Sequence, residues 1–292
     1  MVKLDRRRKY YIVLDCETAT LSIANKFTGE AKKRIAIAKP LIYDLGYKVV
    51  DALGRTYERK SFLIQEIFCV PAIFNTAHYK DKREIYLERL AKGETQIVSW
   101  ENAMKELLFD LERTEATGAF NSMFDFKKAL PFTEEYISHL YDIDYYEWEQ
   151  KQNATCERIA AGEKMENTKE FDQYNFNFRG ADYPMFCLWG LACEYLINND
   201  EYKQYCIDYG RLSPSLKYFS TNAETVFRYL SNNNDFIESH TAIDDADIET
   251  EIFAKVMKKI KKIELGIIYF PFRELGTVER FEIEQSLRGM GK

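Results

Sequence analysis

The feature that most restricts the fold of this chain is a short hydrophobic segment that ends directly in two carboxylates. Tyr10-Tyr11-Ile12-Val13-Leu14 is rich in aromatic and β-branched residues, and its length is typical of a buried strand. Asp15 and Glu17 follow at once. Side chains two residues apart on an extended chain share one face. The segment therefore predicts a strand whose end presents two carboxylates to the same point.

The surrounding pattern predicts one α/β domain. Residues 41–50 and 56–64 predict two strands that continue the first as a β-meander with the first strand central, and residues 100–111 carry an apolar stripe at helical spacing. Between 133 and 220, only 185–197 predicts a confident buried helix. The chain of 292 residues suffices for a single large domain. We expect its core at about 9–131 and 215–263, an insertion at about 133–214 and a C-terminal tail at 264–292.

Two further acidic stretches lie where helices are expected to begin. Residues 118–120 predict a short strand, and Asn121 is a good N-cap for a helix that carries Asp125. Later, His240 precedes the last long helix, where Thr241 and Asp244 have the spacing of a capping box and Asp245 lies in the first turn. Both stretches thus place a carboxylate at the start of a helix.

These residue types suit a metal centre. Carboxylate oxygens are the ligands that Mg²⁺ and Mn²⁺ prefer, and a pair of such ions about 3.5–4 Å apart can stabilise an in-line phosphoryl displacement. A neutral imidazole at His240 could take a proton from a metal-bound water. Each stretch alone has a simpler interpretation, namely a polar turn, helix-start acids that the dipole favours, or a loop histidine. Their joint occurrence in this order favours a site.

Together the three stretches resemble the motifs of the DEDDh exonucleases, which are DnaQ-like members of the ribonuclease H-like superfamily. The matching stretches are Asp15-Cys16-Glu17-Thr18, Asn121-Ser122-Met123-Phe124-Asp125 and His240-Thr241-Ala242-Ile243-Asp244-Asp245-Ala246. A sister group has tyrosine four residues before the last aspartate, where this chain has Thr241, so the histidine branch matches better. The resemblance covers residues from about 9 to 131 and from 215 to 256, and is poor elsewhere.

The resemblance implies both a fold and an activity. The fold would be a ribonuclease H-like mixed central β-sheet flanked by helices, with helical insertions. The activity would be a metal-dependent 3′–5′ exonuclease, a hydrolase that uses two Mg²⁺ or Mn²⁺ ions at the 3′ end of single-stranded DNA or RNA and releases nucleoside monophosphates. The implied metal ligands are Asp15, Glu17, Asp125 and Asp245, the implied general base is His240, and the implied substrate contacts are Thr18, Asn121 and Phe124.

Composition and net charge restrict the kind of nucleic-acid binding and the cellular compartment that we expect. A net charge of −6 argues against a protein that coats nucleic acid through bulk electrostatics, but not against an enzyme that holds one strand end. No run approaches the roughly 20 apolar residues of a membrane span. The six cysteines form no CxxC pair and predict free thiols in a reducing compartment, so we expect a cytoplasmic protein. Zinc binding by Cys187, Cys193 and Cys206 is the alternative to their burial.

Other functions stay open at this point. A non-catalytic module on the same fold could hold nucleic-acid ends or a polymerase partner, and a structural protein could bind calcium in the same acidic pocket. Discrimination between DNA and RNA rests on contacts to the 2′-OH, which the motifs do not encode. The pathway, which could be replication, repair or RNA processing, and the oligomeric state are likewise open.

Overall fold

The central feature of the fold is a seven-stranded sheet with the order β4-β3-β2-β1-β5-β7-β6. The computed structural model describes residues 4–5, 7–20, 39–140, 147, 150, 151, 154, 172–260 and 262–290. The strands are β1 (Tyr10–Thr20), β2 (Pro40–Asp51), β3 (Thr56–Ile64), β4 (Gln96–Val98), β5 (Ala116–Ala119), β6 (Asn175–Phe178) and β7 (Ala181–Cys187). Neighbours β1, β2 and β3 pair antiparallel, whereas β5 is parallel to both β1 and β7. The expected mixed α/β sheet, with the first strand central, is confirmed.

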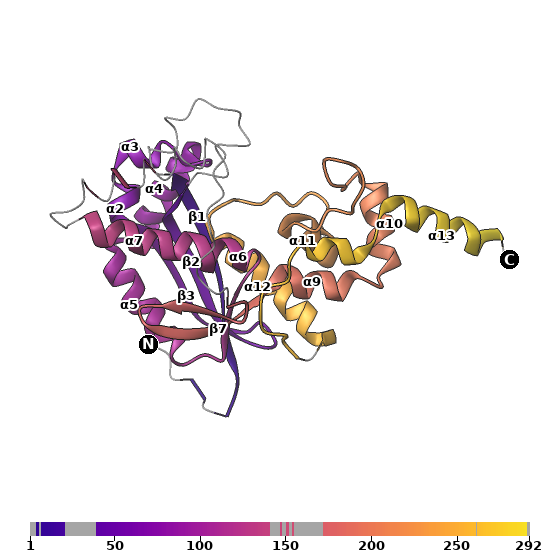
Figure 1. Ribbon diagram of the computed structural model, residues 1–292, viewed down its shortest axis with the longest axis horizontal. Helices are drawn as coiled ribbons and strands as arrows, with labels where there is room; N and C mark the ends of the chain where they lie inside the picture. The colour runs from indigo at the N-terminus through magenta and orange to yellow at the C-terminus, as the bar shows by residue number, and fades with distance from the viewer. Residues whose placement is uncertain are drawn as a thin grey trace.

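Helices flank this sheet and extend beyond it. Their bounds are α2 (Gln65–Phe68), α3 (Pro71–Phe74), η2 (Lys80–Lys82), α4 (Arg83–Lys92), α5 (Trp100–Leu111), α6 (Ser122–Phe124), η3 (Asp125–Ala129), α7 (Leu130–Leu140), α9 (Leu188–Leu196), α10 (Asp200–Asp208), α11 (Ala223–Ser231), α12 (Ala242–Ile260), η4 (Pro271–Leu275) and α13 (Val278–Met290). In Figure 1, α2, α3, α4, α5 and α7 gather around one end of the molecule, α9, α10, α11 and α13 gather around the other, and α6 and α12 lie between them. Within the described residues, no helix is both long and apolar enough to cross a membrane.

The middle of the chain differs from its expected helical form. Residues 185–187 belong to β7, and the helix that we expected from 185 begins only at Leu188. A short apolar run suits a buried strand or a buried helix equally, and here Met185 pairs with Thr117 of β5. The range expected to be an insertion therefore adds β6 and β7 to the central sheet, while most of residues 141–171 lie outside the described part.

Successive side chains of β1 point to opposite faces of the sheet and pack into two different cores. Tyr10, Ile12 and Leu14 pack into the core that contains Trp100 of α5. Tyr11 and Val13 pack into a second core with Ile252 and Phe253 of α12. Because side chains alternate along a strand, Asp15 and Glu17 continue the face that α12 covers. The hydrophobic pattern of the strand thus directs both carboxylates toward the last long helix.

Strand β2 fixes where that helix begins. The backbone N–H of Ala242 donates a hydrogen bond to the carboxylate of Asp44, at 2.9 Å. Gly46 permits the close approach, because a Cβ at this position would lie only 2.3 Å from the backbone nitrogen of Ile243. Asp44 therefore satisfies one of the free N–H groups at the start of α12, a role that we had assigned to a local capping box.

Candidate metal site

Three of the predicted residues converge at the end of β1. Glu17 on β1, His240 in the loop before α12 and Asp245 in its first turn each offer a ligand atom, and these atoms all lie within 4.8 Å of one another. No other group of three or more such ligand atoms occurs within the part of the chain that is described. The zinc site that Cys187, Cys193 and Cys206 could have formed is therefore not found, and all three thiols are free and buried.

Asp15 and Asp125 form an inner part of the same cluster. Strands β1 and β5 run parallel, with Val13 opposite Gly118. The carboxyl ends of the two strands therefore point to the same edge of the sheet. The thiol of Cys16 donates a hydrogen bond to Oδ1 of Asp125, at 2.9 Å, and so ties the two segments together. The pKa of Asp15 is raised well above its usual range by burial and then by the charges of Glu249, Asp245, Asp125 and Glu17. These carboxylates are thus close enough to repel one another.

The electrostatics of the cluster are those of a site that needs a cation. Burial, followed by the charge of Asp245, raises the pKa of Glu17 to about 9. Burial, followed by the charge of Glu238, raises the pKa of Asp245 to about 8. Burial also raises the pKa of Asp125 to about 7 despite the Cys16 hydrogen bond. A divalent ion among these oxygens would favour their ionised forms and reverse the shifts.

Two buried carboxylate oxygens support the same interpretation. Oδ1 of Asp245 and Oε2 of Glu249 have no hydrogen-bond partner among the described residues, although the two side chains belong to residues only 5% and 2% exposed. A buried polar atom without a partner costs free energy, so such atoms call for a ligand. The donor set of hard oxygens fits Mg²⁺ or Mn²⁺.

Two other acids of α12, Asp244 and Asp247, are paired with basic residues of β2, β3 and α4 instead. Asp244 contacts Arg89 in an ion pair and lies 3.8 Å from Arg59. Asp247 lies 2.8 Å from Lys48 and 2.9 Å from Arg59. The helix therefore separates its acids: those that lie against β2, β3 and α4 are paired with basic residues, whereas Asp245 and Glu249 have no such partner among the described residues.

His240 is held in an unusual backbone conformation. Its φ of 51° lies in the left-handed region, which a non-glycine residue rarely adopts. The imidazole stacks on the ring of Tyr79, with centroids 4.3 Å apart, and its Nδ1 lies 3.7 Å from Oε2 of Glu238. Burial, then the charges of Lys82 and His78, lower the pKa of His240. The ring is consequently neutral at physiological pH, as a proton acceptor must be.

The predicted substrate contacts lie around this cluster. Thr18 follows a bulge in β1 between Glu17 and Thr18 and is half-buried. Phe124 ends α6 and packs partly against the core, and Asn121 is exposed. The side chain of Asn121 does not cap the helix as we expected.

Ser122 holds the turn at Asn121. Its hydroxyl accepts from the Ala119 N–H at 3.1 Å and donates to the carbonyl of Phe186 at 2.6 Å. The substrate roles of Thr18, Asn121 and Phe124 stay predictions.

Sequence reasoning did not identify Glu249, Glu238 or Tyr79. Glu249 had a readable signal, since it lies four residues after Asp245 and therefore one helical turn further on the same face. Glu238 and Tyr79 had none, because their place beside His240 depends on tertiary contacts. Asp244 was expected to be a neighbour of the site, and its ion pair with Arg89 agrees with that expectation.

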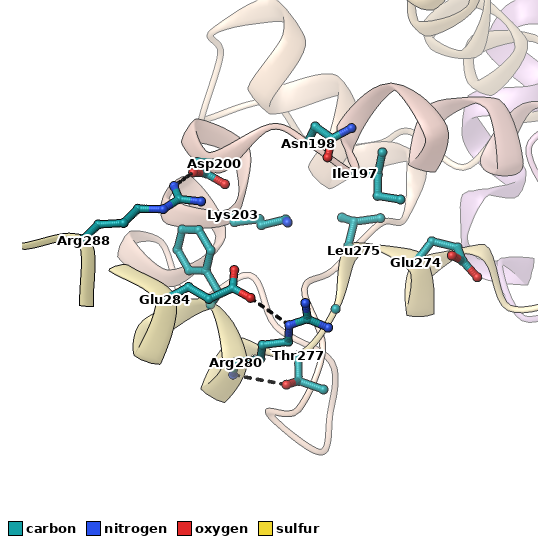
Figure 2. Close-up of a pocket in the computed structure, with 12 residues that line it drawn as sticks. Ile197, Asn198, Asp200, Lys203, Glu274, Leu275, Thr277, Arg280, Glu284 and Arg288 are labelled. Carbon is teal, nitrogen blue, oxygen red and sulfur yellow. Dashed lines mark hydrogen bonds and ion pairs between the residues drawn. The ribbon is translucent and has the colours of Figure 1, made fainter. Parts of the chain in front are cut away.

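The structure also contains a pocket that is lined by residues of the C-terminal third of the chain. It has a volume of about 330 Å³ and lies between the end of α9, α10 and α13 (Figure 2). Its charges are largely paired, Arg288 with Asp200 at 2.6 Å and Arg280 with Glu284 at 2.8 Å. None of the predicted site residues lines it. The pocket is therefore distinct from the acidic cluster.

Comparison with known proteins adds little. Neither a protein-family model nor a curated protein sequence matches this chain. A solved structure described as "3'-end specific recognition of histone mRNA stem-loop by 3'-exonuclease" is 6% identical with a TM-score of 0.40, and the match covers 88% of this chain and 85% of that one. The crystal structure of cell-death related nuclease 4 is 10% identical with a TM-score of 0.34, over 88% of this chain and 66% of that one. At these scores the similarity carries no functional argument.

Proposed function

We propose that this chain is a metal-dependent exonuclease that hydrolyses phosphodiester bonds at the 3′ end of single-stranded DNA or RNA and releases nucleoside monophosphates. The observation that carries the proposal is the convergence of Glu17, His240 and Asp245 within 4.8 Å. Asp15 and Asp125 lie beside them in the same acidic cluster. The 3′–5′ polarity and the monophosphate products follow the resemblance of the three motifs to the DEDDh family.

The proposed metal ligands are Asp15, Glu17, Asp125 and Asp245. Two Mg²⁺ or Mn²⁺ ions bound there would polarise the scissile phosphate and lower the pKa of the attacking water. A phosphate anion cannot approach so many carboxylates unless cations neutralise them, since like charges at close range repel strongly. The cluster therefore supports strict metal dependence as well as metal binding.

His240 is the proposed general base. Its lowered pKa keeps the imidazole neutral, so that it can accept a proton from the attacking water. Stacking on Tyr79 fixes the plane of the ring, and Glu238, 3.7 Å from Nδ1, is placed to stabilise the protonated imidazole. Tyr79 would thus fix the orientation of the base, and Glu238 would offset the positive charge that the imidazole gains on protonation.

The test is degradation of 5′-labelled single-stranded DNA and RNA oligonucleotides with Mn²⁺, with Mg²⁺ and with EDTA. We expect a ladder that shortens from the 3′ end with either metal and no products in EDTA. His240→Ala should slow the reaction by about 10²- to 10⁴-fold, the usual contribution of a general base. Intact label under every metal condition would contradict the proposal. Metal-independent binding of the oligonucleotides without turnover would support a non-catalytic module instead.

The proposed partner is the 3′ end of a single-stranded nucleic acid. A polymerase or replication partner and a cytoplasmic location stay predictions from the sequence. The choice between DNA and RNA is read from the same oligonucleotide assay.

A further inference from the structure

Glu249 is a buried carboxylate to which the predicted motifs give no role. It lies four residues after Asp245 on α12, so the two side chains project from the same face of the helix. The residue is only 2% exposed, and its Oε2 has no hydrogen-bond partner within the described chain. The next residue on that stripe is Phe253, which is fully buried in the core.

The neighbours of Glu249 place it in the inner part of the acidic cluster. Burial, and then the charges of Asp125, Asp245 and Glu238, raise the pKa of Glu249, while the backbone amide of Phe120, just after β5, acts in the opposite direction. From the opposite direction, Glu249 is the foremost charged neighbour of Asp15. The pKa of Glu17, by contrast, is raised by burial and then by the charges of Asp245, Asp44 and Glu238. The charge of Asp245 therefore acts on two groups of acids, and Glu249 belongs to the one that contains Asp15 and Asp125.

A purely structural role does not account for this arrangement. The stripe of α12 that faces the sheet is otherwise apolar beyond this point, and a carboxylate there loses its hydration without gaining an ion pair. One oxygen facing the Phe120 amide compensates only part of that loss. The acids Asp244 and Asp247 show that the same helix pairs its carboxylates where basic residues are within reach.

We propose that Glu249 is a fifth carboxylate ligand of the metal site, on the side formed by Asp15 and Asp125. This inference rests on the proposed function in one respect, namely that a divalent ion binds the cluster. It adds an inner ligand to the four carboxylates of the motifs. Such a ligand would hold the ion more tightly and deeper against the sheet.

Metal binding by the full-length chain tests the inference directly. Mn²⁺ is titrated into metal-stripped wild type, Glu249→Gln and the control Glu251→Gln, and binding is followed by calorimetry and by electron paramagnetic resonance of free Mn²⁺. Glutamine retains the size of the side chain but removes its charge. Glu251 lies on the same helix and is exposed, so the control makes the same chemical change outside the cluster.

We expect Glu249→Gln to weaken Mn²⁺ binding by about 10-fold or more, since even residues that only support metal ligands contribute about 10- to 100-fold. Glu251→Gln should bind as the wild type does. Mn²⁺ affinity of Glu249→Gln equal to that of the wild type would overturn the inference. If Glu249→Gln does not fold, Glu249→Asp replaces it, because the shorter side chain keeps the charge but withdraws the oxygens. Unchanged affinity in that variant would equally overturn the inference.

The two proposals fail in different ways. A wild type that binds no Mn²⁺ and degrades no oligonucleotide would remove the proposed function together with this inference. A wild type that binds Mn²⁺ and degrades oligonucleotides, beside a Glu249→Gln variant of unchanged affinity, would remove the role of Glu249 alone.

Discussion

The imidazole of His240 lies parallel to the phenol ring of Tyr79, with ring centroids 4.3 Å apart and planes 8° apart. The contact joins the loop before α12 to the segment before η2, more than a hundred residues earlier in the chain. Lys82 reinforces it, because its ammonium donates to the carbonyl of Ser239 and lies 5.1 Å from the centre of the Tyr79 ring. The orientation of the proposed base therefore depends on a distant segment.

Removal of this stacking should reduce turnover more than binding. Tyr79→Ala frees the imidazole and loses a ring contact of about 0.5–1.5 kcal/mol, so we expect kcat to fall by roughly 2- to 10-fold with a smaller change in KM. Tyr79→Phe retains the ring and should restore kcat. Steady-state kinetics with a short oligonucleotide measures both. Equal losses in the two variants would mean that the hydroxyl, and not the ring, matters.

Metal-free protein should lose stability as the pH rises. The ordinary pKa of a carboxyl group is about 4, whereas the folded chain holds Asp125 at about 7, Asp245 at about 8 and Glu17 at about 9. Between these limits the folded state binds more protons than the unfolded state. The contribution of these groups to the free energy of unfolding is therefore present at low pH and is lost as the pH rises through 7 to 9.

Thermal unfolding in EDTA measures this dependence. We expect Tm to decline from pH 5 to pH 9, and Asp245→Asn to make the decline shallower. Added Mn²⁺ should raise Tm most at pH 8, where ionised carboxylates are available to bind it. A Tm in EDTA that rises over this range would contradict the account of the cluster.

Substitution of Gly46 should displace the start of α12. The methyl group of Gly46→Ala would meet the backbone of Ala242 and Ile243, which cannot yield as a flexible side chain can. We expect a loss of about 1–3 kcal/mol in the free energy of unfolding and a marked loss of activity, because His240 and Asp245 move with the helix.

Gly190→Ala is the matched control for Gly46→Ala. There the new Cβ would meet only side-chain atoms of Ile268 among its nearest neighbours, at 2.9 Å from Cδ1, 3.2 Å from Cγ1 and 3.3 Å from Cβ, and no backbone atom. Alanine also favours the helical conformation of α9. Denaturant unfolding of both variants gives the comparison, and equal losses would argue against a special role for the β2–α12 contact.

Local signals in the sequence were sufficient to predict part of this molecule. The period of two along β1 predicted that Asp15 and Glu17 share a face, and the structure shows that this face meets α12. The meander of β1, β2 and β3 was readable because its strands are amphipathic or apolar and because a short turn joins β2 to β3. Helix α5 was readable from its apolar spacing.

The remaining features depend on contacts between distant segments. Met185 became part of a strand because β5 offered it a partner, which no local pattern reports. Asp44, and not a neighbour in the sequence, accepts the first N–H of α12. Glu249 lies one helical turn after Asp245, but it otherwise resembled the other acids in the first half of α12, which the helix dipole also favours, so its burial was needed to single it out.

Asp244 and Asp245 offer the most direct test of the central claim, since adjacent aspartates on one helix face different surroundings. Asp244 is paired with Arg89, whereas Asp245 lies with Glu17 and His240. The measurement is the initial rate of 3′-end degradation of a 5′-labelled oligonucleotide with Mn²⁺ by Asp244→Asn and Asp245→Asn. We predict at least about a 100-fold loss for Asp245→Asn, as expected for a lost metal ligand, and a rate within a few-fold of wild type for Asp244→Asn. Full activity in Asp245→Asn would contradict the assignment of the acidic cluster as a catalytic metal site.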